Sequence, residues 1–148
     1  DVGGSIISNL IRSIDKKKIA NIDVYKSLGR YNYHGILALS KKRNFHVVCV
    51  GNSSSGIKET PYFGCPTVNI GSRQKGRLRA GNVIDVNYNK QEIVNAIRKC
   101  IVDKKFINKC KKVTNPYGGG DAGKKIAKIL SSINLKPSFI LRKKMTIK

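Results

Sequence analysis

The sequence predicts an α/β fold with a parallel sheet, and three observations support that prediction. Segments with apolar residues at helical spacing alternate with short β-branched runs, the order typical of a parallel sheet with helical crossovers. Loops rich in small and basic residues follow two of these runs, at the edge where such sheets bind ligands. The length of 148 residues, 40% of them hydrophobic, suits one compact domain with a core.

The first third of the chain predicts two helices and a strand. Apolar residues repeat at helical spacing from 6 to 14, which predicts an amphipathic helix ending in the lysine run at 16–18. Residues 21–28 predict a short strand closed by Gly29. Residues 33–42 predict a second helix.

The middle third supplies the predicted centre of the sheet. The β-branched run at 47–50 predicts a buried strand, and His46 opens it. A helix is expected from Ser54 to Gly64, interrupted near its end by a Thr-Pro pair. Two further strands are expected at 66–70 and 82–86, joined by a polar, basic loop.

The last third predicts mainly helix. Apolar positions from 90 to 102 define an amphipathic helix, followed by a short one around Phe106. A glycine-rich loop at 115–120 leads into Asp121 as a candidate N-cap. The apolar stripe at 126–130 then predicts a final helix.

The strand at 47–50 runs into a turn of small residues, 51–56, that is typical of phosphate binding. Small residues let the backbone approach a ligand, serine hydroxyls add donors, and a following helix start favours anions. Glu59 then stands about one turn into that helix, where a carboxylate can meet a ribose diol. The alternative is an N-capped surface turn without a ligand.

A second ligand-facing loop, at 69–77, follows the next strand. It carries three cations and a glutamine within five residues, Arg73 to Arg77, and arginine clamps a diphosphate bidentately. A solvated charge run is the alternative. Because the two loops are one βα unit apart, both are expected at the same edge of the sheet.

The formal charge of +22, from 30 Lys and Arg against 8 Asp and Glu, raises nucleic-acid binding as an alternative. The lysines are spread along the chain without interleaved aromatic residues, and no nucleic-acid-binding signature is visible. Nucleic acid is therefore not the expected partner. Four cysteines without C-x-x-C spacing argue against a zinc site and fit reduced thiols in a cytoplasmic protein. No apolar stretch approaches the length of a membrane span, so no membrane partner is expected.

Four segments taken in order resemble the C-terminal half of the hydrolysing UDP-N-acetylglucosamine 2-epimerases of sialic and legionaminic acid synthesis. They are 51–59, 66–77, 82–84 and 115–120. The resemblance runs from Asp1 to about Leu135, giving a predicted domain at 1–135 and a basic tail at 136–148. It implies a two-domain fold of the glycosyltransferase B type, of which this chain would be the second, Rossmann-like domain.

The resemblance implies substrate-binding roles for six residues of the two loops. They are Ser53, Ser54, Ser55, Gly56, Glu59 and Arg73. The first two serines would bind the diphosphate, with help from the backbone N–H groups of the next two residues. The carboxylate would take the ribose hydroxyls, and the arginine the phosphate or sugar. Gln74 and Arg77 belong to the same signature, which favours a hydrolysing enzyme over the non-hydrolysing bacterial epimerases.

The family eliminates UDP from UDP-GlcNAc through a glycal, and water then adds to release ManNAc. Its catalytic carboxylates lie in the N-terminal domain and its phosphate-binding histidine precedes this segment, so no catalytic residue, cofactor or metal is expected here. His34 and His46 do not match that histidine and are expected to be structural.

The chain opens without Met on Asp1-Val2-Gly3-Gly4. It is therefore expected to be a fragment that binds a UDP-sugar, lacks the N-terminal domain and does not turn over alone, while the full-length enzyme forms a homo-oligomer. A UDP-sugar transferase of the same fold and a polyanion-binding module stay open as alternatives.

Overall fold

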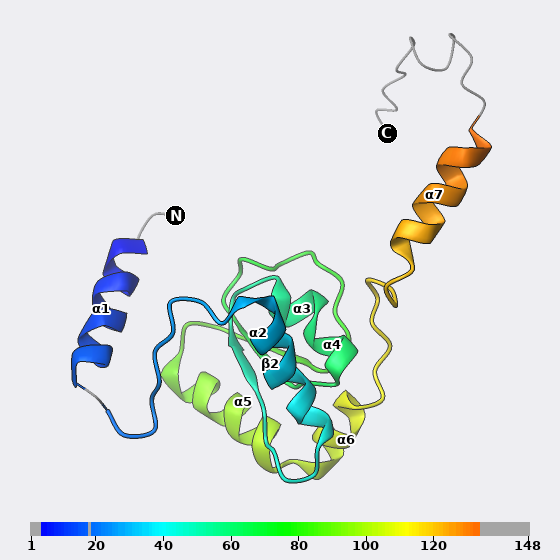
Figure 1. Cartoon of the computed structure of the whole chain (residues 1–148). Helices are drawn as coiled ribbons and strands as arrows, with labels where there is room; N and C mark the ends of the chain where they lie inside the picture. The colour runs from blue at the N-terminus through cyan, green and yellow to red at the C-terminus, as the bar shows by residue number, and fades with distance from the viewer. Residues whose placement is uncertain (1–3, 18, 134–148) are drawn as a thin grey trace.

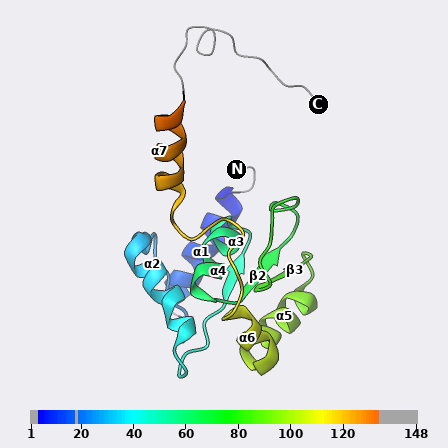
Figure 2. The same cartoon turned by 90° about the vertical axis from the view of Figure 1, so that its right-hand side faces the viewer.

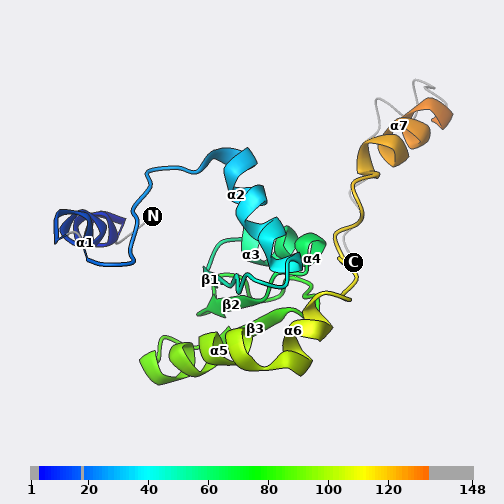
Figure 3. The same cartoon turned by 60° about the horizontal axis from the view of Figure 1, so that its bottom comes forward.

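The computed structural model describes residues 4–17 and 19–133. A small parallel sheet lies between two layers of helices, with α2, α3 and α4 on one face and α5 and α6 on the other (Figures 1 and 3). The predicted α/β class is confirmed. The predicted basic tail at 136–148 lies outside the described residues.

The sheet contains β1 (Cys49–Gly51), β2 (Thr67–Ile70) and β3 (Val83–Val86), in that spatial order and all parallel. All three match predicted strands, although β1 begins two residues late and His46 precedes it on an exposed stretch instead of opening it. Because the strands are parallel, the segments 52–54, 71–82 and 87–89 all leave from one edge of the sheet. This carboxyl edge is where the two predicted ligand loops lie.

The layer beside the serine turn is built from short helices. They are α2 (Gly29–Ala38), which continues into the 3-10 turn η1 (Leu39–Lys41), and the one-turn helices α3 (Ser55–Lys58) and α4 (Thr60–Phe63). Pro61 occupies the first turn of α4, where its missing N–H costs nothing, so the expected helix is interrupted as predicted. Gly64 then caps α4 at φ 62°, and a Cβ there would stand 2.9 Å from the Cα of Lys111.

The opposite layer contains α5 (Lys90–Val102) and α6 (Lys104–Cys110), both as predicted. Side chains of Asn89 and Asp103 cap the first turns of these helices by accepting backbone N–H groups. Val68 of β2 packs against Ala96 and Cys100 of α5 to form the buried core. The side of the sheet facing α5 is therefore apolar, and it anchors β2 at the centre of the domain.

The predicted strand at 21–28 is wrong, because within the described part of the chain this stretch forms no strand. Asn21 adopts φ 65°, outside the extended region, and no neighbouring strand pairs with the segment. Ile22 and Tyr25 are 49% and 66% exposed. Gly29, predicted to close this strand, instead begins α2. A short alternation without a pairing partner cannot satisfy its backbone as a strand.

The terminal helices α1 (Gly4–Lys17) and α7 (Ala122–Ser132) match the predicted amphipathic helices and project from the sheet-centred body (Figures 1 and 2). Their apolar stripes are exposed, from Ile6 at 73% to Leu130 at 62%. Asp121 does precede α7, but its carboxylate pairs with Lys125 Nζ at 2.8 Å and makes no side-chain cap. None of the described helices has the length and apolar character needed to cross a membrane.

Candidate functional site

The serine turn joins β1 to α3 at the carboxyl edge of the sheet. Ser53 Oγ accepts a hydrogen bond from the Ser55 N–H at 3.3 Å, whereas Ser54 stands at the N-cap position and makes no side-chain cap. Within the described part of the chain, the N–H groups of Ser53 and Ser54 make no hydrogen bond. A simple capped turn therefore accounts for one serine hydroxyl and leaves donors available to a ligand.

Gly56 lets α3 approach the sheet. The residue is buried, and a Cβ at this position would lie 3.0 Å from Thr67 Cγ2 and 3.6 Å from Cys49 Sγ. Its N–H already donates to the Ser53 carbonyl at 3.2 Å. The predicted contact of this N–H with a diphosphate stays a prediction, and what the geometry supplies is the close packing that sets the turn in place.

The second loop meets the serine turn at one carbonyl oxygen. Gln74 is buried, and its Nε2 donates to the Asn52 carbonyl at 2.7 Å, while Arg73 Nη1 lies 3.5 Å from the same oxygen. The two predicted ligand loops are therefore side by side, as their spacing along the chain predicted. Gln74 Oε1 is buried and makes no hydrogen bond to a described residue.

Three arginines of this loop differ in how they are used. Arg79 donates from Nε to Asp85 Oδ2 at 2.6 Å, from Nη1 to the Arg77 carbonyl at 2.6 Å and from Nη2 to the Gln74 carbonyl at 2.9 Å. Arg73 and Arg77 are exposed and form no ion pair with a described residue. Arg79 therefore stabilises the loop, whereas the charges of Arg73 and Arg77 are available to a ligand. No motif in the sequence singled out Arg79.

Glu59 lies between α3 and α4, beside α2. Its Oε2 is 2.7 Å from His34 Nε2, and the two side chains are 42% and 34% exposed. Tyr33, the neighbour of His34, contacts the hydroxyl of Ser55. Two consecutive residues of α2 therefore touch two predicted substrate-binding residues, a pairing that periodicity could not reveal.

A pocket of about 360 Å³ opens beside Glu59. The glycine-rich loop forms one wall, since Asn115 Nδ2 donates to the Lys58 carbonyl at 2.9 Å and Tyr117 Oη donates to the Leu78 carbonyl at 3.1 Å. Lys58 Nζ lies 5.6 Å from the centre of the Tyr117 ring. The volume is within the range of small-molecule sites. The position of the motif identified this loop, but neither motif nor spacing assigned a role to the residues that line the pocket.

A second pocket, of about 600 Å³, lies at the same edge and is lined by the other loop. Lys75, Arg77 and Arg79 face it together with Asp85. The carboxylate already accepts from Arg79 and from Asn69 Nδ2 at 2.6 Å. Lys75 and Arg77 form no ion pair with a described residue, and they give this pocket a positive charge suited to an anion.

At the amino ends of β2 and β3, a threonine–asparagine network of Thr60, Thr67 and Asn82 fixes the layers together. Thr60 Oγ1 donates to the Gly56 carbonyl at 2.7 Å and accepts from Thr67 Oγ1 at 2.9 Å and from Asn82 Nδ2 at 3.0 Å. Asn82 Nδ2 also donates to the Cys65 carbonyl at 2.7 Å. All three side chains are buried, so the network holds the α3–α4 junction on the sheet.

The four cysteines are free, and their surroundings do not activate them. Burial raises the pKa of Cys65 to about 12 and the pKa values of Cys100 and Cys110 to about 11. Burial also raises the pKa of Cys49. A thiol that keeps its proton at neutral pH is a poor nucleophile. Among the described residues, no group of three or more His, Cys, Asp or Glu side chains could hold a metal ion.

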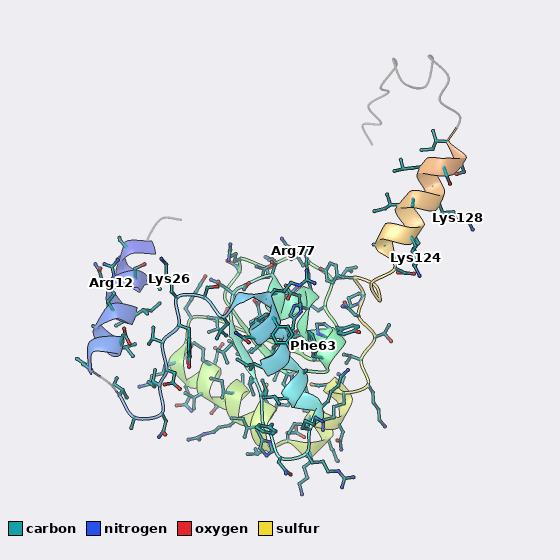
Figure 4. The ribbon with its side chains drawn as sticks, in the orientation of Figure 1. Arg12, Lys26, Phe63, Arg77, Lys124 and Lys128 are labelled. Carbon is teal, nitrogen blue, oxygen red and sulfur yellow. The ribbon has the colours of Figure 1, made fainter. Side chains whose placement is uncertain are left out.

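The positive charge is dispersed over the molecule. Figure 4 shows Arg77 on the sheet-centred body, Arg12 on α1, and Lys124 and Lys128 on the projecting α7. In the described part of the chain, Asp85 and Asp121 form ion pairs with Arg79 and Lys125, and Glu59 contacts the imidazole of His34. Most cations therefore face solvent on separate elements and do not form one stripe.

A parallel sheet between helical layers, with glycine-rich loops at its carboxyl edge, defines a Rossmann-like α/β domain. The chain belongs to the UDP-N-acetylglucosamine 2-epimerase family, whose model matches residues 1–131.

Two of three curated relatives carry names of hydrolysing epimerases, and the third is named a 2-epimerase without that qualifier. The UDP-N,N′-diacetylbacillosamine 2-epimerase (hydrolyzing) of Legionella pneumophila is 35% identical over 136 residues, covering 91% of this chain and 32% of that protein. The GDP/UDP-N,N′-diacetylbacillosamine 2-epimerase (hydrolyzing) of Campylobacter jejuni is 37% identical over 89 residues, covering 60% and 22%. The UDP-N-acetylglucosamine 2-epimerase of Neisseria meningitidis is 31% identical over 130 residues, covering 88% and 30%. The chain thus spans less than a third of the length of each.

Proposed function

We propose that this chain is the UDP-binding part of a hydrolysing 2-epimerase acting on UDP-GlcNAc or a diacetamido relative. The observation that carries the proposal is the meeting of the two loops at the Asn52 carbonyl, through Gln74 at 2.7 Å and Arg73 at 3.5 Å. That contact brings serine hydroxyls to one edge together with N–H groups and cations that have no partner among the described residues. Hydroxyls, N–H groups and arginines are the donors that bind a diphosphate.

In this proposal, different residues of the edge bind the diphosphate and the ribose of the nucleotide. Ser53, Ser54 and Ser55 bind the diphosphate with the backbone at Gly56, and Arg73 contacts the phosphate or sugar. Glu59 takes the ribose hydroxyls, since its carboxylate borders the 360 Å³ pocket and Oε1 makes no bond to a described residue. The 600 Å³ pocket beside Arg77 adds positive charge near the same edge.

In the proposed reaction, a base removes the proton from C2 of the sugar, the C1–O bond breaks, and UDP leaves with the bonding electrons. Water then adds across the resulting C1–C2 double bond, and the proton returns to C2 on the opposite face, releasing the epimerised free sugar. This chain would stabilise the leaving diphosphate electrostatically. The acid and base groups would come from the rest of the enzyme, so the chain alone should bind UDP without turnover.

A titration of the labelled 148-residue chain with UDP, followed by backbone amide shifts, tests the binding proposal. We expect the largest shifts at 53–59 and 73–77, saturating with one UDP per chain. Shifts confined to α1 and α7, or none at all, would contradict it.

The charge of +22 supports polyanion binding as the competing function. Single-stranded DNA is the matched competitor for the titration. If the UDP site is specific, excess DNA should leave the UDP shifts in place, whereas a general anion surface should lose both ligands as salt rises. Sugar transfer to an acceptor by the full-length enzyme would instead favour the transferase alternative.

A further inference from the structure

We propose that Tyr33 and His34 of α2 are positioning residues for the ligand edge. Tyr33 orients the hydroxyl of Ser55 toward the diphosphate, and His34 holds the carboxylate of Glu59 toward the ribose. This inference rests on the proposed UDP-binding function and adds an element, α2, that neither the ligand loops nor the motifs contain.

The Tyr33 contact acts on the diphosphate side. Its Oη touches Ser55 Oγ and lies 3.8 Å from Cys49 Sγ, which places the phenol between β1 and the serine turn. Burial raises the pKa of Tyr33 to about 12, so the phenol keeps its proton at neutral pH. A phenol that donates to Ser55 Oγ leaves the serine proton free to donate to a phosphate oxygen.

The His34 contact acts on the ribose side. Its Nε2 lies 2.7 Å from Glu59 Oε2, and the imidazole centre lies 5.2 Å from that of Phe63, at an interplanar angle of 46°. The ring is therefore held from α4 while its nitrogen reaches the carboxylate. A carboxylate fixed through Oε2 loses less side-chain entropy when Oε1 binds a hydroxyl, because its rotamer is already set.

Helix α2 is anchored firmly enough to serve this purpose. Leu37 is buried at 2% exposure, and Ser40 Oγ, just after the helix, contacts the carbonyls of Leu37 at 2.7 Å and Phe63 at 2.8 Å. Figures 1 and 3 show α2 lying beside α3 and α4. One anchored helix therefore contacts both halves of the proposed site through adjacent residues.

Three ligands separate the two roles when titrated into the 148-residue chain. They are UDP, 2′,3′-dideoxy-UDP and inorganic pyrophosphate. His34→Leu should weaken UDP about fivefold and leave the other two unchanged, because only UDP offers the diol. His34→Gln, whose amide nitrogen can replace Nε2, should restore UDP affinity. Tyr33→Phe should weaken all three ligands by a similar factor of about five.

Matched controls come from the same chain. Tyr31 is 92% exposed on α2, and His46 is exposed before β1, so Tyr31→Phe and His46→Leu should bind all three ligands like the unaltered chain. Amide spectra of each variant check that the fold is retained. A general loss of packing would lower the affinity for every ligand in His34→Leu and would not be rescued by His34→Gln.

The outcomes separate this inference from the proposed function. Suppose the unaltered chain binds UDP, and both Tyr33→Phe and His34→Leu bind each of the three ligands as tightly as the unaltered chain does. The positioning roles are then overturned, and UDP binding stands. The ribose role of His34 is also overturned if His34→Leu weakens all three ligands equally and His34→Gln does not restore UDP affinity. If the unaltered chain binds neither UDP nor pyrophosphate, the proposed function falls, and the positioning roles fall with it.

Discussion

Two polar regions of this domain lie only a few residues apart in sequence and differ in how their hydrogen bonds are satisfied. In the threonine–asparagine network, Thr60 Oγ1 makes three hydrogen bonds and every side chain is buried. At the ligand edge, formed by residues 53–55, 59 and 73–77, the N–H groups of Ser53 and Ser54 make no hydrogen bond to a described residue. All side-chain donors of the network are paired, although Asn82 Oδ1 is buried and accepts no hydrogen bond from a described residue. Donors that are paired with one another hold a scaffold, whereas unpaired donors at a loop edge are available to a ligand.

The largest effect should come from cutting the network. Asn82→Ala removes the donor to Thr60 Oγ1 and to the Cys65 carbonyl, and it leaves a buried carbonyl unpaired. We expect the free energy of unfolding to fall by about 2 to 3 kcal/mol in urea denaturation. Asn87→Ala, at an exposed asparagine after β3, is the control and should change it by less than about 0.5 kcal/mol. If the two variants changed the free energy of unfolding by the same amount, the structural role assigned to the network would be contradicted.

A smaller loss is expected where α3 meets the sheet. In Gly56→Ala the new methyl group would lie 3.0 Å from Thr67 Cγ2, so the unfolding free energy should fall by about 1 to 2 kcal/mol. Gly35→Ala in α2 is the matched control, because no described atom outside the local helix backbone lies within 4 Å of its Cβ position. Alanine favours helix, so this control should be neutral or stabilising by up to about 1 kcal/mol. If Gly35→Ala lowered the free energy of unfolding and Gly56→Ala did not, the close packing of α3 on the sheet at Gly56 would be contradicted.

The buried thiols near the network predict a gradual effect of alkaline pH. An unfolded cysteine has a pKa of about 8.5, whereas burial raises the pKa of Cys65 to about 12. The folded state therefore keeps a proton that the unfolded state releases, and this stabilisation is full below pH 8.5 and is lost toward pH 12. Unfolding free energy measured between pH 8 and 10 should fall less steeply in Cys65→Ala. An identical slope in both chains would argue against a buried, protonated thiol.

The sequence predicted what depends on local pattern. Periodicity located β1, β2, β3 and α5, and the spacing of two loops along the chain correctly placed them at one edge. It failed at 21–28, where alternating residues lack a strand to pair with, because pairing depends on the rest of the fold. Strand formation is decided by neighbours more than by intrinsic preference.

Contacts between distant residues could not be predicted in the same way. Arg77 and Arg79 are the same residue type two positions apart, yet only Arg79 is held by Asp85 and by two carbonyls. The pairing of His34 with Glu59 joins residues 25 positions apart, one on α2 and the other between α3 and α4. Neither arrangement leaves a periodic signal, so residue type and position indicated a basic loop and a carboxylate without showing how each is positioned.

The most direct test of the contrast between these regions is the affinity of Arg73→Gln for UDP, measured by calorimetry beside the unaltered chain. Arg73 makes one contact of 3.5 Å and no ion pair with a described residue, so its charge is available to the diphosphate. We expect UDP affinity to fall about tenfold or more while the unfolding free energy changes by less than about 0.5 kcal/mol. Unchanged UDP affinity in a folded Arg73→Gln chain would contradict the assignment of this edge to the nucleotide.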